Sequence, residues 1–245
     1  MANERLRAAL LQHGLTPEDI AAKTGVDPKT VERWVTQGRI PYRRYRYAVA
    51  AMLKLDERYL WPDGMTTEQA ADASESEIVT VYPHRWAVPR DTWGVLFGAA
   101  EREISVFVYS GLFLADDTGM IRLFAAKAEA GVRVRILLGD PDSSHVAQRG
   151  VDEGIDESMS ARIRNALALY KPLRGRDNVE IGLHDTTLYN SIYRADDDLY
   201  VNTHIYGSPA ANAPVLHLRK VAGGSMVTTY LESFERVWAD ARRVD

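Results

Sequence analysis

The stretch 16–38 constrains the fold of this chain most, because it holds the start and stop signals of two short helices around one glycine. Thr16 is an N-cap residue, and Pro17 behind it is favoured at the first helical position. Gly25 ends that helix, and Asp27, followed by a proline, starts the next one. Two short helices joined by such a turn form a helix-turn-helix. The predicted helices cover residues 17–24 and 28–37.

The second helix of the pair has one apolar face and one polar face. Helices this short are not stable alone, and Val31 and Trp34 supply apolar contacts to the flanking helices. Lys29, Thr30 and Arg33 are then on the outward face. A helix lying in the major groove of DNA presents such side chains to base edges, so we expect these three residues to read bases.

Positive charge is concentrated in and after this helix, although the whole chain has a formal net charge of −4. Residues 29–46 contain six basic residues and one acid, Glu32. A solvated basic face is one interpretation of such a run. Its position at a helix-turn-helix favours a surface that neutralises DNA phosphates. The residues expected to contact phosphates are Gln37, Arg39, Arg43, Arg44 and Arg46.

Residues 1–63 as a whole resemble the five-helix DNA-binding domain of the lambda repressor/Cro type (XRE family). The resemblance implies an all-α domain that binds double-stranded DNA, and domains of this type read two half-sites as dimers. The chain departs from the family at Pro28 and Glu32, which are not typical base-reading residues, so the preferred DNA sequence is not predicted. The expected helices are 3–12, 17–24, 28–37 and 42–53, followed by a short turn at 56–62.

The composition is that of a two-domain globular protein. The chain has 245 residues, of which 46% are hydrophobic, enough for a packed core. It contains no cysteine, which excludes disulfides and thiolate metal sites. No apolar run is long enough to span a membrane, and the first residues begin a helix rather than a secretory signal. We expect a cytoplasmic, nucleoid-associated protein, and the excess of arginine and alanine suggests a GC-rich bacterial genome.

A polar stretch separates two regions of different periodicity. Residues 64–77 hold four acids and no base and predict an acidic linker, with a short helix over 67–73 as the alternative. From residue 78 onward, apolar runs alternate with helical stretches, which predicts an α/β domain over 78–245 with a largely parallel sheet and an antiparallel tail. The expected strands are 78–81, 104–109, 132–138, 179–183, 199–205 and 215–220, and the expected helices are 89–102, 118–130 and 225–241.

Three segments of the α/β region occur in a distinctive order. A helix ending Ala-Ala-Glu-Arg-Glu precedes the strand Ile-Ser-Val-Phe-Val-Tyr-Ser, Ala-Lys-Ala-Glu-Ala-Gly precedes Val-Arg-Val-Arg-Ile-Leu-Leu-Gly, and Leu-Glu-Ser-Phe-Glu-Arg-Val-Trp lies near the end. This order resembles the phospholipase D-like superfamily, with a mixed sheet, over residues 78–245. The catalytic His-x-Lys of that family, followed by four residues and Asp, is not intact, because Tyr189, Ser191 and Asp196 occupy its positions. We therefore expect no enzyme activity of the usual kind. Members with one motif per chain pair two chains, so the resemblance also implies a homodimer.

The strands expected to be buried carry an unusual density of polar groups, which is costly unless they bind one another or a ligand. We interpret them as a former catalytic cleft that binds an anionic or phosphate-bearing small molecule, with Arg194 or Arg219 holding the anion. For each residue alone, a satisfied structural role is the alternative, and 196–198 is also typical of a hairpin turn. No spacing typical of a metal site is present, and we expect no cofactor. The predicted ligand site comprises His184, Tyr189, Ser191, Arg194, Asp196, Asn202, His204, His217 and Arg219.

Together these features predict a sequence-specific transcriptional regulator. The helix-turn-helix would bind DNA, and the α/β domain would sense a ligand, join two chains, or do both. Two alternatives stay open. One is a nucleic-acid phosphodiesterase that uses Tyr189 or a histidine as an unusual nucleophile. The other is an antitoxin-like or protein-interaction regulator, which would co-purify with a small protein.

Overall fold

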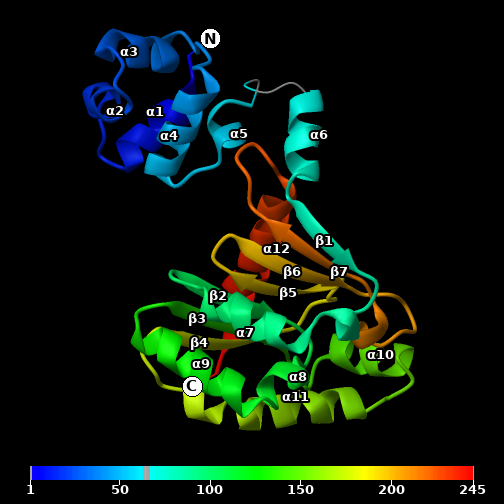
Figure 1. Cartoon of the computed structure of the whole chain (residues 1–245). Helices are drawn as coiled ribbons and strands as arrows, with labels where there is room; N and C mark the ends of the chain where they lie inside the picture. Colours follow the sequence, from blue (N-terminus) through cyan, green and yellow to red (C-terminus); the bar gives the residue numbers. More distant parts are fainter. Residues whose placement is uncertain (1, 63, 65–66, 245) are drawn as a thin grey trace. The chain divides into compact units, whose positions relative to one another are not determined.

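The computed structural model describes residues 2–62, 64 and 67–244, and it separates into two compact units (Figure 1). One unit is Met1–Ser76 with Val221–Ser225, and the other is Glu77–Lys220 with Met226–Asp245. Of the predicted domain junction, Asp63, Met65 and Thr66 lie outside the described residues. The fold is a helical region followed by an α/β region, as predicted.

The helical unit contains the predicted helix-turn-helix as α2 and α3. The Thr16 hydroxyl accepts a hydrogen bond from the Asp19 amide at 3.3 Å, while the Asp19 carboxylate accepts one from the Thr16 amide at 2.8 Å. Gly25 ends α2 with a left-handed φ of 71°, and the Asp27 carboxylate caps α3 through the Lys29 amide at 2.8 Å. These caps satisfy amides that the helices leave free, as the sequence predicts. The helices are α1 (Glu4–Gln12), α2 (Pro17–Thr24), α3 (Pro28–Thr36), α4 (Arg43–Leu53) and α5 (Glu57–Leu60).

A single small core holds these helices together. Ile20 of α2, Val31 of α3 and Val49 of α4 are each 0% exposed. Asn3 joins three helices. Its side-chain oxygen caps α1, and its backbone N–H donates to the Val35 carbonyl of α3. Its side-chain nitrogen donates to the Leu60 carbonyl of α5 at 2.7 Å. The packing fixes which face of α3 remains outside.

The segment predicted as an acidic linker is helical in its central part. Helix α6 spans Thr67–Glu75. The segment is rich in alanine, glutamate and glutamine, which have high intrinsic helix propensity. The alternative interpretation, a short helix, is therefore the one that holds.

The α/β unit is built on one sheet of eight strands in the order β1-β7-β6-β5-β2-β3-β4-β8. Strands β2, β3 and β4 are parallel, while β5, β6 and β7 form antiparallel pairs and β1 and β8 complete the edges. Most strand pairings are antiparallel, so the prediction of a largely parallel sheet is wrong. The parallel region is limited to β2, β3 and β4, and the antiparallel tail is confirmed. The strands are β1 (Ile78–Tyr82), β2 (Glu103–Phe107), β3 (Arg133–Gly139), β4 (Val179–His184), β5 (Asn190–Ala195), β6 (Asp198–Thr203), β7 (Val215–Arg219) and β8 (Arg242–Arg243).

Helices cover both faces of this sheet (Figure 1). The α7 residue Trp93 packs on Tyr193 of β5, and Phe97 of α7 packs on Phe124 of α9, whereas Phe234 of α12 packs on Phe107 from the other face. No helix among residues 2–62 and 67–244 is both long and apolar enough to cross a membrane. The helices are α7 (Arg90–Gly98), α8 (Leu112–Ala115), α9 (Thr118–Glu129), α10 (Ser144–Asp152), α11 (Ser158–Leu169) and α12 (Met226–Asp240), with 3-10 turns η1 (Arg85–Ala87), η2 (Lys171–Leu173) and η3 (Ala210–Asn212).

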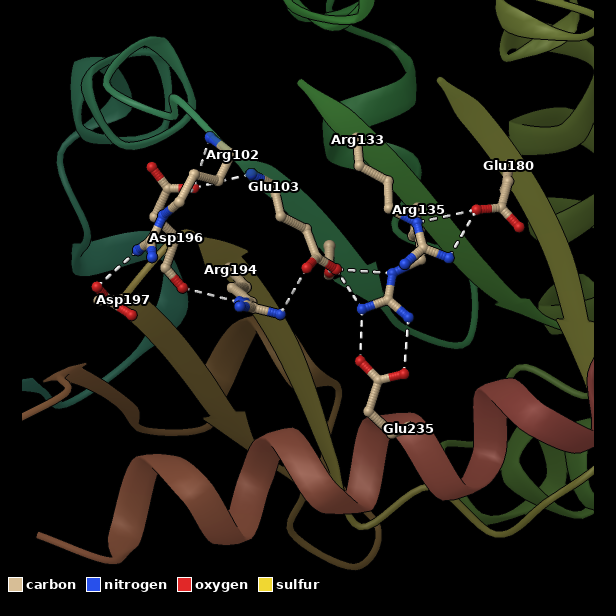
Figure 2. Close-up of polar contacts among 10 residues, drawn as sticks. Arg102, Glu103, Arg133, Arg135, Glu180, Arg194, Asp196, Asp197 and Glu235 are labelled. Carbon is tan, nitrogen blue, oxygen red and sulfur yellow. Dashed lines mark hydrogen bonds and ion pairs between the residues drawn. The ribbon is translucent and has the colours of Figure 1, made fainter. Parts of the chain in front are cut away.

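A buried ionic cluster attaches α12 to its face of the sheet (Figure 2). Arg135 on β3 donates to Glu103 of β2 at 2.7 Å and to Glu235 of α12 at 2.8 Å, and its guanidinium lies 4.5 Å from the ring centre of Phe234. Arg194 of β5 pairs with Glu103 at 3.0 Å. Arg135 is only 2% exposed, so this charge is stabilised by its partners rather than by water.

Candidate functional site

Helix α3 presents a polar face to solvent. Val31, Trp34 and Val35 are buried against the other helices, and Lys29 and Arg33 are exposed on the opposite side. Thr30, also predicted to read bases, is partly buried. The outward face of α3 therefore carries two free cationic side chains that a groove of DNA would meet directly.

More cations surround the C-terminal end of α3. Gln37, Arg39, Arg43 and Arg44 are all exposed. The Arg44 guanidinium stacks 4.5 Å from the ring centre of Tyr45, which positions it without neutralising it. In the part of the chain that the structure describes, none of these arginines forms an ion pair with a carboxylate. Arg43 Nη2 donates to the Ala222 carbonyl at 3.1 Å, a contact that leaves its charge uncompensated. The charge of these arginines therefore remains available to an external anion.

Arg46 is the exception, and its assignment to phosphate contacts is wrong. It is 7% exposed, its Nε lies 2.6 Å from the Glu57 carboxylate, and its Nη1 donates to the Pro41 carbonyl at 2.9 Å. Glu57 comes from α5, beyond the run of basic residues that suggested a DNA contact. Arg46 stabilises the helical unit from within.

In the α/β unit, the register places several predicted ligand residues on one face of the sheet but at different heights. Ser191 lies opposite Asn202, and Tyr193 lies opposite Tyr200, which in turn lies opposite His217. Because side chains two residues apart share a face, these residues all point towards the α7 side. The residue opposite Asn202 on β7 is Val215, two residues before His217. His217 therefore lies at a different height, and the predicted ligand residues do not meet at one point.

Ser191 and His204 do meet, and they line a cavity of about 100 Å³. The Ser191 hydroxyl lies 3.0 Å from His204 Nε2, and His204 Nδ1 lies 2.9 Å from the Leu188 carbonyl. Tyr109 stacks on His204 with ring centres 6.0 Å apart and accepts a hydrogen bond from the Leu188 amide. Other lining residues include Arg85, Ser110, Glu153, Arg162 and Tyr193.

The hydrogen bonds of His204 determine where its proton lies. A carbonyl oxygen only accepts, so Nδ1 carries the hydrogen and Nε2 accepts from the Ser191 hydroxyl. Burial, reinforced by the positive charge of Arg149, lowers the pKa of His204 to about 4. The imidazole is therefore neutral at physiological pH.

The positive charge of the cavity comes from residues that the sequence analysis did not select. Arg85 and Arg162 form no ion pair among the described residues, and the Arg85 guanidinium lies 4.2 Å from the ring centre of Phe113. The acid in the lining, Glu153, is already paired with Arg149, whose Nε donates to it at 2.7 Å. Arg162 and Glu153 lie between β3 and β4, where the sequence analysis predicted no element. Their only sequence signal was their charge.

The two arginines predicted to hold an anion are bound by carboxylates instead. Arg194 faces α12 and pairs with Glu103 (Figure 2). The Arg219 Nε donates to Asp198 at 2.9 Å, and His217 Nε2 lies 2.9 Å from the same carboxylate oxygen. His217 also stacks on Tyr200, with ring centres 4.3 Å apart. All three side chains bind other residues of the same unit, so the assignment of Arg194, His217 and Arg219 to one ligand site is wrong.

Asp196 belongs to a turn, as the alternative interpretation allowed. It has a left-handed φ of 52° between β5 and β6. Its carboxylate accepts hydrogen bonds from the amides of Glu101, Arg102 and Glu103 at 2.8 to 2.9 Å. Although burial acts in the opposite direction, these bonds hold the pKa of Asp196 below its ordinary value. Asp196 thus fixes the start of β2 and is not part of the cavity (Figure 2).

The remaining predicted residues are also outside the cavity lining. His184 is 2% exposed and its Nε2 lies 3.2 Å from the Val108 carbonyl, and burial lowers its pKa to about 4. Asn202 is fully buried and its amide donates to the carbonyls of Ala213 and Pro214. Tyr189 is 78% exposed. Of the nine predicted residues, only Ser191 and His204 line the cavity.

Two family models match the chain, and several solved structures are similar to it. A family model of a helix-turn-helix domain matches residues 15–60. No curated protein matches the chain. Among solved structures, the chain is similar to TrmBL2, an archaeal chromatin protein whose structure shows a novel mode of DNA binding. It is 15% identical to this chain, with 89% of this chain and 72% of that one covered and a TM-score of 0.44.

A second solved structure is the phospholipase D family member Nuc from Salmonella typhimurium, at 11% identity, with 63% of this chain and 90% of that one covered and a TM-score of 0.37. The α/β unit is matched as a whole by a family model described as a domain of unknown function (DUF5919), over residues 75–245. The chain therefore belongs to that family and carries a helix-turn-helix domain at its N-terminal end.

Proposed function

We propose that this protein is a sequence-specific DNA-binding transcriptional regulator. The observation that supports this best is the set of exposed cations on and beside α3, which have no carboxylate partner among the described residues. Lys29 and Arg33 read base edges, and Arg39, Arg43 and Arg44 neutralise phosphates. The domain is of the XRE type, acts in the cytoplasm at the nucleoid, and binds an inverted repeat as a homodimer, with recognition helices about 34 Å apart.

Selection of bound fragments from sheared genomic DNA tests this proposal, with wild type beside Arg33→Ala and Arg43→Ala. Wild type enriches an inverted repeat. Arg33→Ala loses affinity for that repeat by about 5- to 150-fold while random DNA is bound as before. Arg43→Ala weakens binding to all sequences. Equal losses on both kinds of DNA for Arg33→Ala, or no enrichment by wild type, would contradict the assignment.

We propose further that the α/β domain is a degenerate phospholipase D-like domain whose cavity binds an anionic group of an effector. Two cations without ion pairs, Arg85 and Arg162, line it together with the Ser191 hydroxyl. The cavity is about 100 Å³, well below the roughly 300 to 1,000 Å³ of typical ligand pockets. It therefore accommodates one carboxylate or phosphoryl group, with the rest of the effector outside.

Thermal stabilisation by inorganic phosphate and by sulfate tests this site. Either anion raises the Tm of the α/β transition in the wild-type chain, since a ligand that binds the folded state stabilises it. The rise disappears in Arg85→Ala and Arg162→Ala. Arg164→Ala is the control, because Arg164 is on the same helix and exposed like Arg162, but it does not line the cavity and is paired with Asp142. A rise that persists in both cavity variants would exclude this site.

Ser191 and His204 resemble a nucleophile and base, but we propose that the domain is not an enzyme. A general base works best when its pKa is near the working pH, and a pKa of about 4 makes His204 a weak base. The Leu188 carbonyl rather than a carboxylate accepts the hydrogen bond from its Nδ1, so an imidazolium would be stabilised less than in a Ser-His-Asp triad. Hydrolysis of a generic phosphodiester that is lost in Ser191→Ala, His204→Ala or Tyr189→Phe would overturn this view and favour the phosphodiesterase alternative.

Dimerisation completes the proposal, because an anion bound near paired subunits can change the spacing of the two recognition helices. Sedimentation of the purified chain measures its oligomeric state directly. A dimer whose DNA affinity changes when effector is added fits the proposal. A monomer that co-purifies with a small protein would favour the antitoxin-like alternative.

A further inference from the structure

One acidic side chain interrupts the basic face of α3. Lys29, Glu32, Arg33 and Thr36 occupy helical positions i, i+3, i+4 and i+7, so they form one stripe along the helix. All four are exposed. Glu32 is the only acid between residues 28 and 54 of the sequence.

The carboxylate of Glu32 is not used within the helical unit. Over the ranges that the structure describes, it forms no ion pair, although basic residues precede and follow it. The hydroxyl of Thr36 donates to the backbone carbonyl of Glu32 at 2.7 Å, not to its carboxylate. The N-terminus of α3 is capped by Asp27. The fold therefore does not require an acid at position 32.

An acid at this place is unfavourable for general DNA binding. The stripe that would enter the groove faces a polyanion, and a carboxylate there is repelled by phosphates on both sides. That repulsion is offset only where a hydrogen-bond donor on a base edge meets the carboxylate. An exposed, unpaired glutamate among cations thus lowers affinity for most sequences and retains it for a few, which is how specificity is gained.

The chemistry of the major groove identifies the base. Cytosine presents an amino donor there, guanine and thymine present acceptors, and adenine presents a donor beside an acceptor that repels a carboxylate. We infer that Glu32 is a specificity-determining residue that selects cytosine at one position of each half-site. The inference rests on the proposed function, namely that α3 enters the major groove. Arg33, next to it, suits the acceptors of a guanine.

Binding selection from a randomised duplex library tests the inference, using the full chain and its Glu32→Gln and Glu32→Ala variants. Wild type enriches cytosine at one position of each half-site by about 5- to 150-fold over other bases. Glu32→Gln changes that preference to adenine, because a glutamine amide pairs with both the donor and the acceptor of adenine. Glu32→Ala abolishes the preference there and binds random DNA more tightly.

Glu18→Gln is the matched control, because it removes the same charge from an exposed glutamate of the neighbouring helix α2. It leaves the preferred base unchanged at every position. If wild type enriches no sequence, the proposed function fails, and this inference fails with it. If wild type enriches a repeat and Glu32→Gln enriches the same repeat with the same bases, the proposed function stands and only the role of Glu32 is overturned.

Discussion

The two units use arginine in opposite ways. In the helical unit, Arg33, Arg39, Arg43 and Arg44 are exposed and have no carboxylate partner among the described residues. In the α/β unit, most arginines that contact the sheet are held by carboxylates, and Arg135 contacts two of them. The difference shows that the number of basic residues says little by itself. What matters is whether an acid lies within reach once the chain has folded.

The largest effect is expected where a paired arginine is removed. Arg135→Ala leaves Glu103 buried beside one remaining cation and detaches Glu235 of α12, so we expect a loss of about 3–5 kcal/mol in the free energy of unfolding. Urea denaturation of the α/β transition measures it. Arg133→Ala is the control on the same strand, because its pair with Glu180 is exposed to solvent and contributes about 1 kcal/mol or less (Figure 2). Equal losses for the two variants would show that burial of the pair is unimportant.

Arg46 provides the same test inside the helical unit. Arg46→Ala leaves the Glu57 carboxylate buried without its partner, and we expect the unit to lose about 3 kcal/mol or more. A double replacement, Arg46→Met with Glu57→Leu, recovers most of that loss, because both charges are gone. Thermal melting of the three proteins shows this order. If Arg46→Ala melts at the wild-type temperature yet binds DNA more weakly, Arg46 contacts DNA phosphates rather than stabilising the core.

Acid is expected to destabilise the α/β unit through two buried histidines. The pKa of His184 and of His204 is lowered to about 4 in the folded α/β unit, whereas an unfolded histidine has a pKa near 6.5. The unfolded chain therefore binds protons first, and stability that is complete above about pH 6.5 is lost progressively as the pH falls towards 4, by up to about 3 kcal/mol per histidine. The pKa values of Asp196 and Asp198 are lowered as well. They change the stability only below about pH 4, outside the range in which the two histidines titrate.

Calorimetry between pH 7 and 4.5 checks the acid effect. The α/β transition moves to lower temperature, and His204→Asn reduces that movement. A transition that stays at one temperature over this range would mean that both imidazoles are protonated without cost in the folded state.

The smallest effect concerns the free cations. Arg43→Ala changes the free energy of unfolding by about 1 kcal/mol or less, since the side chain is exposed and loses one hydrogen bond, to the Ala222 carbonyl. It lowers DNA affinity at low salt and reduces the slope of log affinity against log salt by about 0.9 for the one lost phosphate contact. Titration of labelled DNA at several salt concentrations gives the slope. An unchanged slope would remove Arg43 from the contact surface.

Local signals predicted the helical unit well. The caps at Thr16 and Asp27 depend on residues within three positions of each other, so the sequence alone determines them. Arg46 was misassigned because its partner, Glu57, comes from another helix and was outside the stretch whose charge was counted. A count of charges within one stretch of sequence does not reveal an ion-pair partner from another helix.

The same limit explains the cavity. Alternation along a strand indicates which of its residues share a face. The height of each residue depends on the register between neighbouring strands, which the pattern of one strand does not give. Ser191 is on β5, and His204 directly follows the end of β6. They meet because the register places Ser191 opposite Asn202, at the end of the hairpin away from its turn. Arg85 and Arg162 were missed because they reach the cavity from η1 and α11, which no strand pattern connects to it.

The strand order also determines when each unit can form during synthesis. The core of the helical unit lies within residues 6–61, so the contacts of this core are complete soon after that segment leaves the ribosome. The sheet must wait, because β1 pairs with β7 and the start of β2 is held by Asp196 from the β5–β6 turn. Contacts between such distant segments form slowly. A nascent chain thus presents a folded, positively charged module well before the domain proposed to regulate it exists.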